Sequence, residues 1–243
     1  MFSRALQESG VKQREDGAPS YQLKRFKYNS HYWILKLLSQ AKVPSRILDV
    51  GTSEGYLGAI LKQQGHFLVG VENDHESAEI ARSHYDNFHV ENVEDFSFPY
   101  QNEFDYILFA DVLEHLRNPA DVLQKSLRSL KKNGQIILSV PNVANSVIRL
   151  SLLAGRFEYA DRGIVDRSHL RFFTLSTLKQ MLSECGLVAV DIAAAPIPVQ
   201  LVLPLTDTKF FSPLHEFHHM MVRIRKPLFA YQFIARAVLK EAL

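Results

Sequence analysis

The chain has 243 residues, of which 47% are hydrophobic and 22% charged, a composition typical of one folded domain and not of a disordered chain. The 28 Lys or Arg and 26 Asp or Glu leave a net charge of +2, which disfavours a general nucleic-acid binder. Because Cys185 is the only cysteine, neither an internal disulfide nor a paired-cysteine zinc site can form, and we expect a cytoplasmic protein.

Strands and helices are predicted to alternate along the first 140 residues. After a polar arm at residues 1–27, the apolar positions between Asn29 and Ala41 predict an amphipathic helix that Ser30 caps. Buried strands are predicted at residues 46–50, 67–71, 89–90, 104–109 and 135–140. Helices are predicted at residues 57–64, 76–85 and 119–130, the last ended by Asn133–Gly134. This alternation predicts an α/β fold with a parallel sheet and helices on both faces.

A glycine turn links the first strand to the following helix between Ile47 and Tyr56. Gly51 lets the backbone approach a ligand closely, and Gly55 opens a helix whose free N–H groups attract polar ligand groups. Glu72 ends the next strand, where a carboxylate can accept hydrogen bonds from both hydroxyls of a ribose. The combination predicts a ribose-bearing ligand; the alternative is a turn that merely connects packed elements.

The turn Asp49-x-Gly51-x-Ser53-x-Gly55 resembles the first motif, D/E-x-G-x-G-x-G, of class I S-adenosylmethionine (SAM) methyltransferases, with Ser53 replacing the middle glycine. The resemblance covers roughly residues 28–193 and the C-terminal strand, and it points to the branch that includes ubiquinone-type and glycan-cluster O-methyltransferases. It implies a doubly wound, seven-stranded, mostly parallel Rossmann-like sheet whose last strand is antiparallel.

The same resemblance implies SAM as the cofactor. Glu72 matches the ribose-binding acid, Asn92–Val93 falls where the adenine is held, and the backbone of Ala110–Asp111 faces the methionine end. Tyr28 occupies a position that often covers the cofactor. The residues expected to bind SAM are Tyr28, Asp49, Gly51, Thr52, Ser53, Gly55, Tyr56, Glu72, Asn73, Asn92, Val93, Ala110 and Asp111.

Two histidines are candidate general bases. Methyl transfer from a sulfonium requires aligned reactants and excluded water and, for a hydroxyl acceptor, removal of a proton. His115 follows the fourth strand and His169 lies in a segment after the fifth, and histidine titrates near neutrality. We therefore expect both to be catalytic, the alternative for each being a structural role. Substrate contacts are expected at Arg171, Asn142 and Tyr159.

Asp111, Glu114 and His115 have the i, i+3, i+4 spacing that places side chains on one helical face. Such ligands suit magnesium or zinc, and the resembling branch can hold a divalent cation in a similar cluster. Because Asp111 is also expected to face SAM, we predict that no metal is bound.

The chain is expected to form a single domain, in which the C-terminal end completes the sheet. Its parts are an N-terminal arm and helix (1–42), a SAM-binding core (43–193), an insertion or cover (194–227) and a final strand with the C-terminus (228–243). Residues 209–243 have a net charge of +4, whereas the preceding 208 residues have −2. We expect residues 209–227 to cover or recruit an anionic, partly apolar acceptor, or to contact a membrane surface or a second copy.

These features predict a SAM-dependent methyltransferase that acts on an oxygen of a small molecule, a sugar or a lipid-linked glycan. A nicotinamide-dependent reductase and a non-catalytic SAM-binding or scaffold protein are the alternatives; the absent third glycine of a dinucleotide fingerprint disfavours the reductase. No nucleic acid is expected as a partner, because the body of the chain is mildly acidic.

Overall fold

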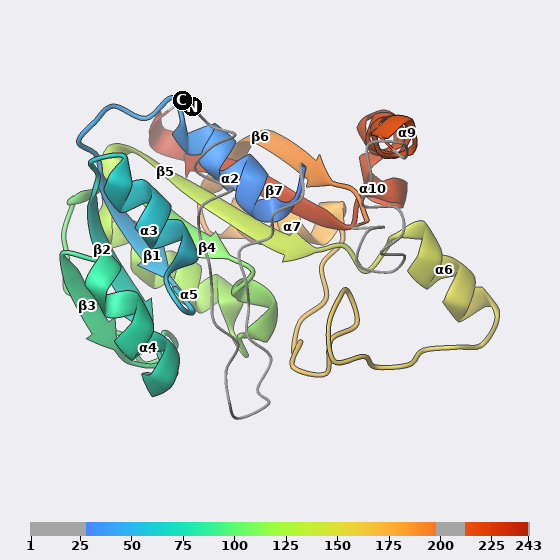
Figure 1. Cartoon of the computed structure of the whole chain (residues 1–243), viewed down its shortest axis with the longest axis horizontal. Coiled ribbons are helices and arrows are strands. Elements are labelled where there is room, and N and C mark those ends of the chain that lie inside the picture. The colour runs from blue at the N-terminus through green and yellow to red at the C-terminus, as the bar shows by residue number, and fades with distance from the viewer. Residues whose placement is uncertain (1–27, 198–211, 243) are drawn as a thin grey trace.

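A seven-stranded sheet with helices on both faces forms the centre of the molecule (Figure 1). The computed structural model describes residues 28–197 and 212–242, so the predicted arm and part of the predicted insertion, residues 198–211, lie outside the described residues. The strands are β1 (Arg46–Val50), β2 (Phe67–Glu72), β3 (Asn87–Val90), β4 (Phe104–Ala110), β5 (Leu130–Pro141), β6 (Leu187–Ala195) and β7 (Gln232–Leu239).

The α-helices are α2 (Ser30–Leu38), α3 (Tyr56–Gln63), α4 (His75–Ala81), α5 (Pro119–Ser126), α6 (Ser146–Leu153), α7 (Leu175–Glu184), α9 (Ser212–Ile224) and α10 (Lys226–Phe229). Single 3-10 turns occur at Arg82–His84, Leu113–His115, Leu127–Ser129 and Lys240–Ala242. Within the described residues, no helix has the length and apolar character that would let it span a bilayer.

The strand order is β3-β2-β1-β4-β5-β7-β6, and β7 runs antiparallel to both of its neighbours. The other pairings, from β3 to β5, are all parallel. The predicted doubly wound, mostly parallel sheet with an antiparallel last strand is therefore confirmed. Because the parallel strands end at one edge, the turns that follow β1, β2, β4 and β5 are gathered there.

Two apolar cores cover the two faces of the sheet. On one face α2 and α3 pack through Ile34, Leu38 and Leu61, while on the other α5 and α7 pack through Val122 and Leu178, all fully buried. Burial of each such aliphatic side chain contributes about 1.5–3 kcal/mol, which is what holds the site-bearing turns at the sheet edge.

Several predicted boundaries were wrong for local reasons. Asn29, not Ser30, caps α2, because the extended Asn29 backbone lets its side chain accept from the N–H of Tyr32 at 2.7 Å. The helix that begins at Pro119 does not reach Leu130, whose backbone pairs with Phe104, so β5 already includes Asn133–Gly134.

The last strand begins later than predicted. Residues 226–229 form the short helix α10, because Pro227 lies in its first turn, a position that proline favours. The strand β7 consequently starts at Gln232 instead of at residue 228.

Candidate functional site

A cavity of about 570 Å³ lies at the edge where β1, β2 and β4 end, a size typical of small-molecule sites. Of the thirteen residues predicted to bind a cofactor, eleven line it: Asp49, Gly51, Thr52, Ser53, Tyr56, Glu72, Asn73, Asn92, Val93, Ala110 and Asp111. The candidate base His115 lines it as well. Its described lining includes seven Asp or Glu and no Lys or Arg, so the cavity favours a cationic ligand and disfavours phosphate groups.

The turn after β1 is built on left-handed backbone conformations. Gly51 has φ 71°, and a Cβ atom added there would lie 2.5 Å from Cγ2 of Val112, so only glycine fits. Ser53 also has a positive φ, 48°, which explains why its position can be occupied by glycine in similar turns. Gly55, with φ 78°, caps α3 without lining the cavity.

Glu72 is locked at the end of β2 by backbone donors. Its carboxylate accepts hydrogen bonds from the N–H groups of Ser53 at 2.7 Å, Asn73 at 2.9 Å and Asp74 at 3.0 Å. A carboxylate offers about four acceptor positions, so these bonds orient Glu72 and leave capacity for a ligand hydroxyl.

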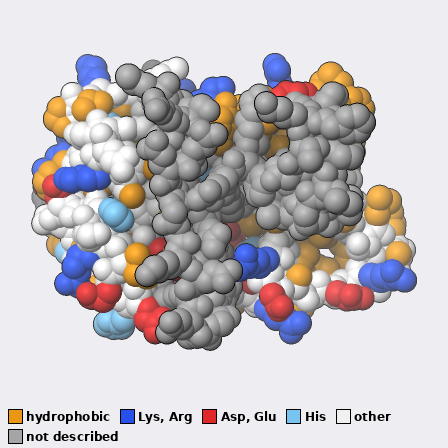
Figure 2. All heavy atoms as spheres, in the orientation of Figure 1, with side chains coloured by type: hydrophobic (Ala, Val, Ile, Leu, Met, Phe, Trp, Pro, Cys, Tyr) orange, Lys and Arg blue, Asp and Glu red, His pale blue; other side chains and the backbone are white. Residues whose placement is uncertain are grey.

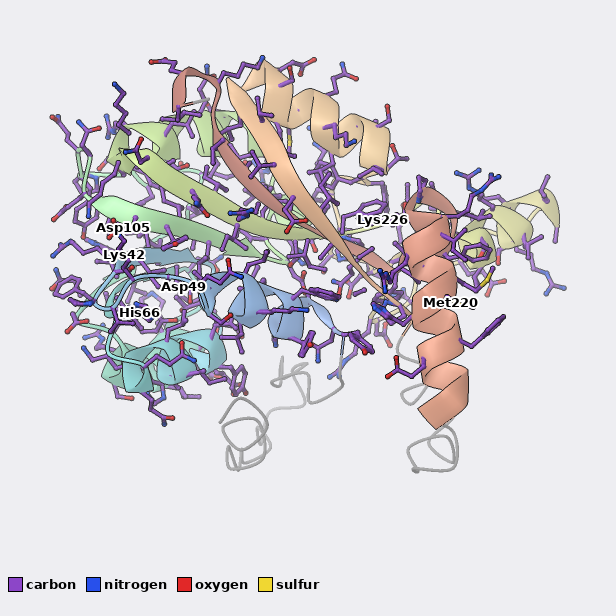
Figure 3. The ribbon with its side chains drawn as sticks, turned by 90° about the horizontal axis from the view of Figure 1, so that it is seen from above. Lys42, Asp49, His66, Asp105, Met220 and Lys226 are labelled. Atoms are coloured by element: carbon purple, nitrogen blue, oxygen red, sulfur yellow. The ribbon has the colours of Figure 1, made fainter. Side chains whose placement is uncertain are left out.

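Asp49, labelled in Figure 3, is a buried carboxylate in the wall of the cavity. Its Oδ2 accepts from the Tyr85 hydroxyl at 2.6 Å, while its buried Oδ1 has no hydrogen-bond partner among the described residues. Burial, reinforced by the charge of Glu72 and opposed by the Tyr85 bond, raises the pKa of Asp49 from 3.8 to about 6. The unpartnered oxygen is suited to a ligand group that donates a hydrogen bond or carries positive charge.

His115 lines the cavity, and His169, which is not among the lining residues, packs against it from outside. Their rings pack edge to face with centroids 4.9 Å apart, because the N–H groups of Leu170 and Arg171 both donate to the Glu114 carbonyl, at 2.8 and 2.9 Å. The sequence prediction placed both histidines near the acceptor, and the structure brings the two together.

Backbone carbonyls determine which nitrogen of each histidine is basic. Nδ1 of His115 lies 3.2 Å from the Ser168 carbonyl and Nδ1 of His169 lies 3.1 Å from the Ile164 carbonyl. A carbonyl only accepts, so both Nδ1 atoms donate and both Nε2 atoms of the neutral rings carry the lone pair. Burial lowers the pKa of His169, which keeps that ring neutral and ready to accept a proton at neutral pH.

The predicted helical face of Asp111, Glu114 and His115 does not form. Asp111 has φ 57° and precedes the single 3-10 turn of Leu113–His115. Its carboxylate accepts hydrogen bonds from the hydroxyls of Ser139 and Ser30. Glu114, His115 and His169 instead offer ligand atoms that all lie within 4.8 Å of one another, so these are the described residues best able to hold a divalent ion.

The predicted substrate-binding residues lie outside the cavity lining. Nε of Arg171 donates to the Arg117 carbonyl at 2.9 Å, and the buried amide of Asn142 donates to the Ala230 carbonyl at 2.9 Å. Tyr159 is exposed and packs edge-on against a neighbouring aromatic ring. Their roles toward a substrate stay predictions.

Tyr28 also lies outside the lining of the cavity. Its ring stacks on His219 of α9 at 3.9 Å, and its hydroxyl donates to Glu216 at 3.2 Å. The N-terminal segment is therefore tied to α9, and it is His31, not singled out from the sequence, that lines the cavity from this segment.

Tyr231 is a further residue that sequence reasoning missed. Its hydroxyl would lie 3.3 Å from a Cβ added to Gly163, so it contacts the segment that carries His169. Burial, together with the charges of Asp111 and Asp166, raises the pKa of Tyr231 to about 12. Only the antiparallel pairing of β7 beside β5 reveals that this tyrosine belongs to the same edge as the cavity.

Comparison with known proteins agrees with this geometry. A family model described as "Methyltransferase domain" matches residues 21–192. The ubiquinone biosynthesis O-methyltransferase of Hydrogenovibrio crunogenus is 26% identical over 149 residues, which cover 58% of this chain and 61% of the relative. That of Thiobacillus denitrificans is 25% identical over 150 residues, covering 58% of this chain and 64% of the relative. The chain thus matches about three fifths of the length of these relatives.

Solved structures share the fold. A SAM-dependent methyltransferase from Archaeoglobus fulgidus superposes with a TM-score of 0.61 at 16% identity, covering 85% of this chain and 91% of that one. The magnesium protoporphyrin IX methyltransferase of Synechocystis, solved with bound SAH, gives 0.57 at 14% identity, covering 85% and 80%.

Proposed function

The chain belongs to the methyltransferase-domain family, and we propose that it binds S-adenosylmethionine in the acid-lined cavity and transfers the methyl group to a hydroxyl oxygen of a small acceptor. The observation that carries the proposal is the cavity itself, in which Glu72 and Asp49 flank a glycine turn and no described Lys or Arg is present.

The residues of the cavity fit this cofactor. S-adenosylmethionine carries a sulfonium and an ammonium charge and a ribose, but no phosphate. Seven acidic side chains complement the positive charges, Glu72 retains acceptor capacity for a ribose hydroxyl, and Oδ1 of Asp49 is a buried acceptor without a described partner. A side chain at Gly51 would clash with Val112, so the cavity wall at this turn is bare backbone.

When bound, S-adenosylmethionine supplies a methyl group already activated by its positive sulfur. The work left for the protein is to position the acceptor, exclude water and remove the hydroxyl proton. His169 is suited to take that proton on Nε2, because its Nδ1 is engaged by the Ile164 carbonyl and burial keeps the ring neutral. His115 stands beside it with the same tautomer and is the second candidate base.

An oxygen acceptor is supported by the two adjacent histidines and by the names of relatives about 25% identical, which are ubiquinone biosynthesis O-methyltransferases. A phenolic hydroxyl, a sugar and a lipid-linked glycan are the acceptor classes that suit this chemistry. The acid-rich cavity argues against the alternative of a nicotinamide reductase, whose cofactor brings a pyrophosphate into the same turn.

The test is calorimetric titration of the protein with S-adenosylmethionine and, in parallel, with NADPH. Micromolar binding of the first and none of the second is expected; no binding of S-adenosylmethionine would overturn the proposal. The acceptor is then sought by mass spectrometry with panels of phenols and sugars. An N-methylated product from an aminophenol would contradict oxygen transfer, and a failure to methylate any acceptor would favour the non-catalytic scaffold alternative.

A further inference from the structure

Four of the five apolar side chains of the helix α6 are half exposed or more. Five of its eight residues are apolar, yet none is buried, and Leu150 and Leu153 are 65% and 83% exposed. Short helices are normally held by a packed apolar face, and exposed apolar surface of this kind marks an interaction site.

The helix α9 presents a second apolar stripe at the same end of the molecule. Phe217, Met220 and Ile224 share one helical face and are about half exposed or more, whereas Val222 points to the protein core and is fully buried. Figure 1 places α10 between α6 and α9, and Figure 3 shows α9, with Met220, beyond the ends of β6 and β7.

Hydrogen bonds tie the start of α6 to the end of α10. The Asn145 side chain caps α6 by accepting from the N–H of Val147 at 3.0 Å, and its amide donates to the carbonyl of Ala230 at 2.9 Å. Because Ala230 directly follows α10, the start of α6 and the end of α10 form one unit. In the space-filling view, hydrophobic side chains gather over both α6 and α9 at this end, with Lys or Arg side chains beside them (Figure 2).

This surface is also basic. Residues 146–167 and 216–226 together contain seven Lys or Arg and four Asp or Glu, a net charge of +3, so the rest of the chain carries −1. Arg149 and Arg156 are exposed on and just after α6, and Arg223 and Arg225 at the end of α9. Positive charge around an exposed apolar stripe matches an anionic lipid surface and would repel a second copy of the same face.

We propose that residues 146–167 and 216–226, hereafter the apolar-basic end, dock onto the surface of an anionic phospholipid bilayer. The leucines of α6 and the Phe217 stripe of α9 enter the boundary between headgroups and acyl chains, and the arginines pair with lipid phosphates. The segment that follows α6 carries His169, so docking would turn the two candidate bases, His115 and His169, toward the lipid surface.

The test is co-sedimentation of the full chain with vesicles. The two preparations are pure phosphatidylcholine and an equal mixture of phosphatidylcholine and phosphatidylglycerol. The wild-type chain is expected to pellet with the anionic vesicles and to remain in solution with the neutral ones.

Paired variants assign the contact. Leu150→Asp with Leu153→Asp should abolish binding to the anionic vesicles, and Ile80→Asp with Val43→Asp should leave it unchanged. The control residues are 48% and 60% exposed and lie on α4 and before β1, away from α6 in Figure 1. Neutralising Arg156 and Arg223 to Gln should weaken binding about fivefold each, whereas the same change at exposed Arg82 should have little effect.

Circular dichroism and S-adenosylmethionine binding verify that each variant is folded, since both report on the sheet and cavity and not on lipid. The proposal is overturned if the wild-type chain does not bind the anionic vesicles, or if the control pair loses binding as fully as the α6 pair. It is equally overturned if sedimentation shows a dimer that the α6 substitutions dissociate without any lipid binding, because the surface would then join two copies.

Discussion

The ring of His115 lies edge-on to the ring of His169, with the centroids 4.9 Å apart, although the residues are 54 positions apart in the chain. The Glu114 carbonyl creates this pair by accepting from two successive N–H groups that follow His169. Two ring nitrogens that can accept a proton thereby lie close together, and a positive charge on His115 lowers the pKa of His169.

Replacing either histidine is expected to remove catalysis and not cofactor binding. His169→Ala and His115→Ala should lower the turnover rate by about 10²–10⁴-fold if each contributes general-base catalysis, with the larger loss at His169. Single-turnover rates and calorimetric S-adenosylmethionine titration separate the two effects. His75→Ala, at the exposed start of α4, is the matched control. Full activity of both active-site variants would show that neither histidine is the base.

The pH dependence of kcat/KM should report a base with a depressed pKa. Burial lowers the pKa of His169, so the rate should rise with pH and reach half of its plateau below the ordinary histidine value of 6.5. The Asp166 carboxylate favours the protonated ring, and Asp166→Asn is therefore expected to move the rising limb to still lower pH. A shift to higher pH in this variant would contradict the assignment of His169.

Glu72 is expected to be required for cofactor affinity. In Glu72→Gln an amide replaces a carboxylate that accepts from three backbone N–H groups, and its NH₂ would oppose one of those donors. Loss of charge-assisted hydrogen bonds costs about 1.5–3 kcal/mol, a tenfold to hundredfold rise in the Kd for S-adenosylmethionine. Glu79→Gln, on the exposed side of α4, should leave the Kd unchanged. Equal affinities of the two variants would refute a ribose-binding role.

Alanine substitutions at two glycines with nearly the same φ distinguish the cost of a left-handed backbone from the cost of a steric clash. Gly51 and Gly155 have φ 71° and 70°, but a Cβ would clash with Val112 at Gly51 and meet nothing within 4 Å at Gly155. Gly155→Ala should cost about 1 kcal/mol of unfolding free energy from the left-handed backbone alone. Gly51→Ala should cost about 1–3 kcal/mol more and abolish S-adenosylmethionine binding. Urea denaturation measures both; similar losses would mean that Val112 moves aside freely.

Asp49 should make the ligand-free protein less stable as the pH rises. Its pKa is about 6 in the folded chain and near 3.8 when unfolded, so its contribution is present below pH 3.8 and lost as the pH passes 6. This difference corresponds to about 3 kcal/mol. Relative to Asp49→Asn, wild-type unfolding free energy should fall by about that amount from about pH 4 to about pH 7. The exposed Asp191→Asn is the control, and a pH-independent difference for Asp49→Asn would contradict a buried, unpartnered carboxylate.

Most of the residues that line the cavity could be predicted, because they lie in short stretches of the chain. The glycine turn after β1 and the acid at the end of β2 each depend on residues close in sequence, and parallel pairing then brings them to one edge. Eleven of thirteen predicted residues consequently line the cavity. Tyr28 does not, because its ring stacks on His219 of α9, a partner that no local pattern indicates.

By itself, the sequence determined an α/β fold with a parallel sheet and the turn that forms the cavity, since alternation of apolar strands and helices is a local property of the chain. The antiparallel last strand was implied by the family resemblance and not by this alternation. Tertiary structure alone decided that His115 joins His169 and that Asp111 leaves the helical face predicted for it. It also decided that α6 packs against nothing that buries it. These outcomes depend on backbone hydrogen bonds and packing between segments far apart in the chain, which side-chain periodicity does not encode.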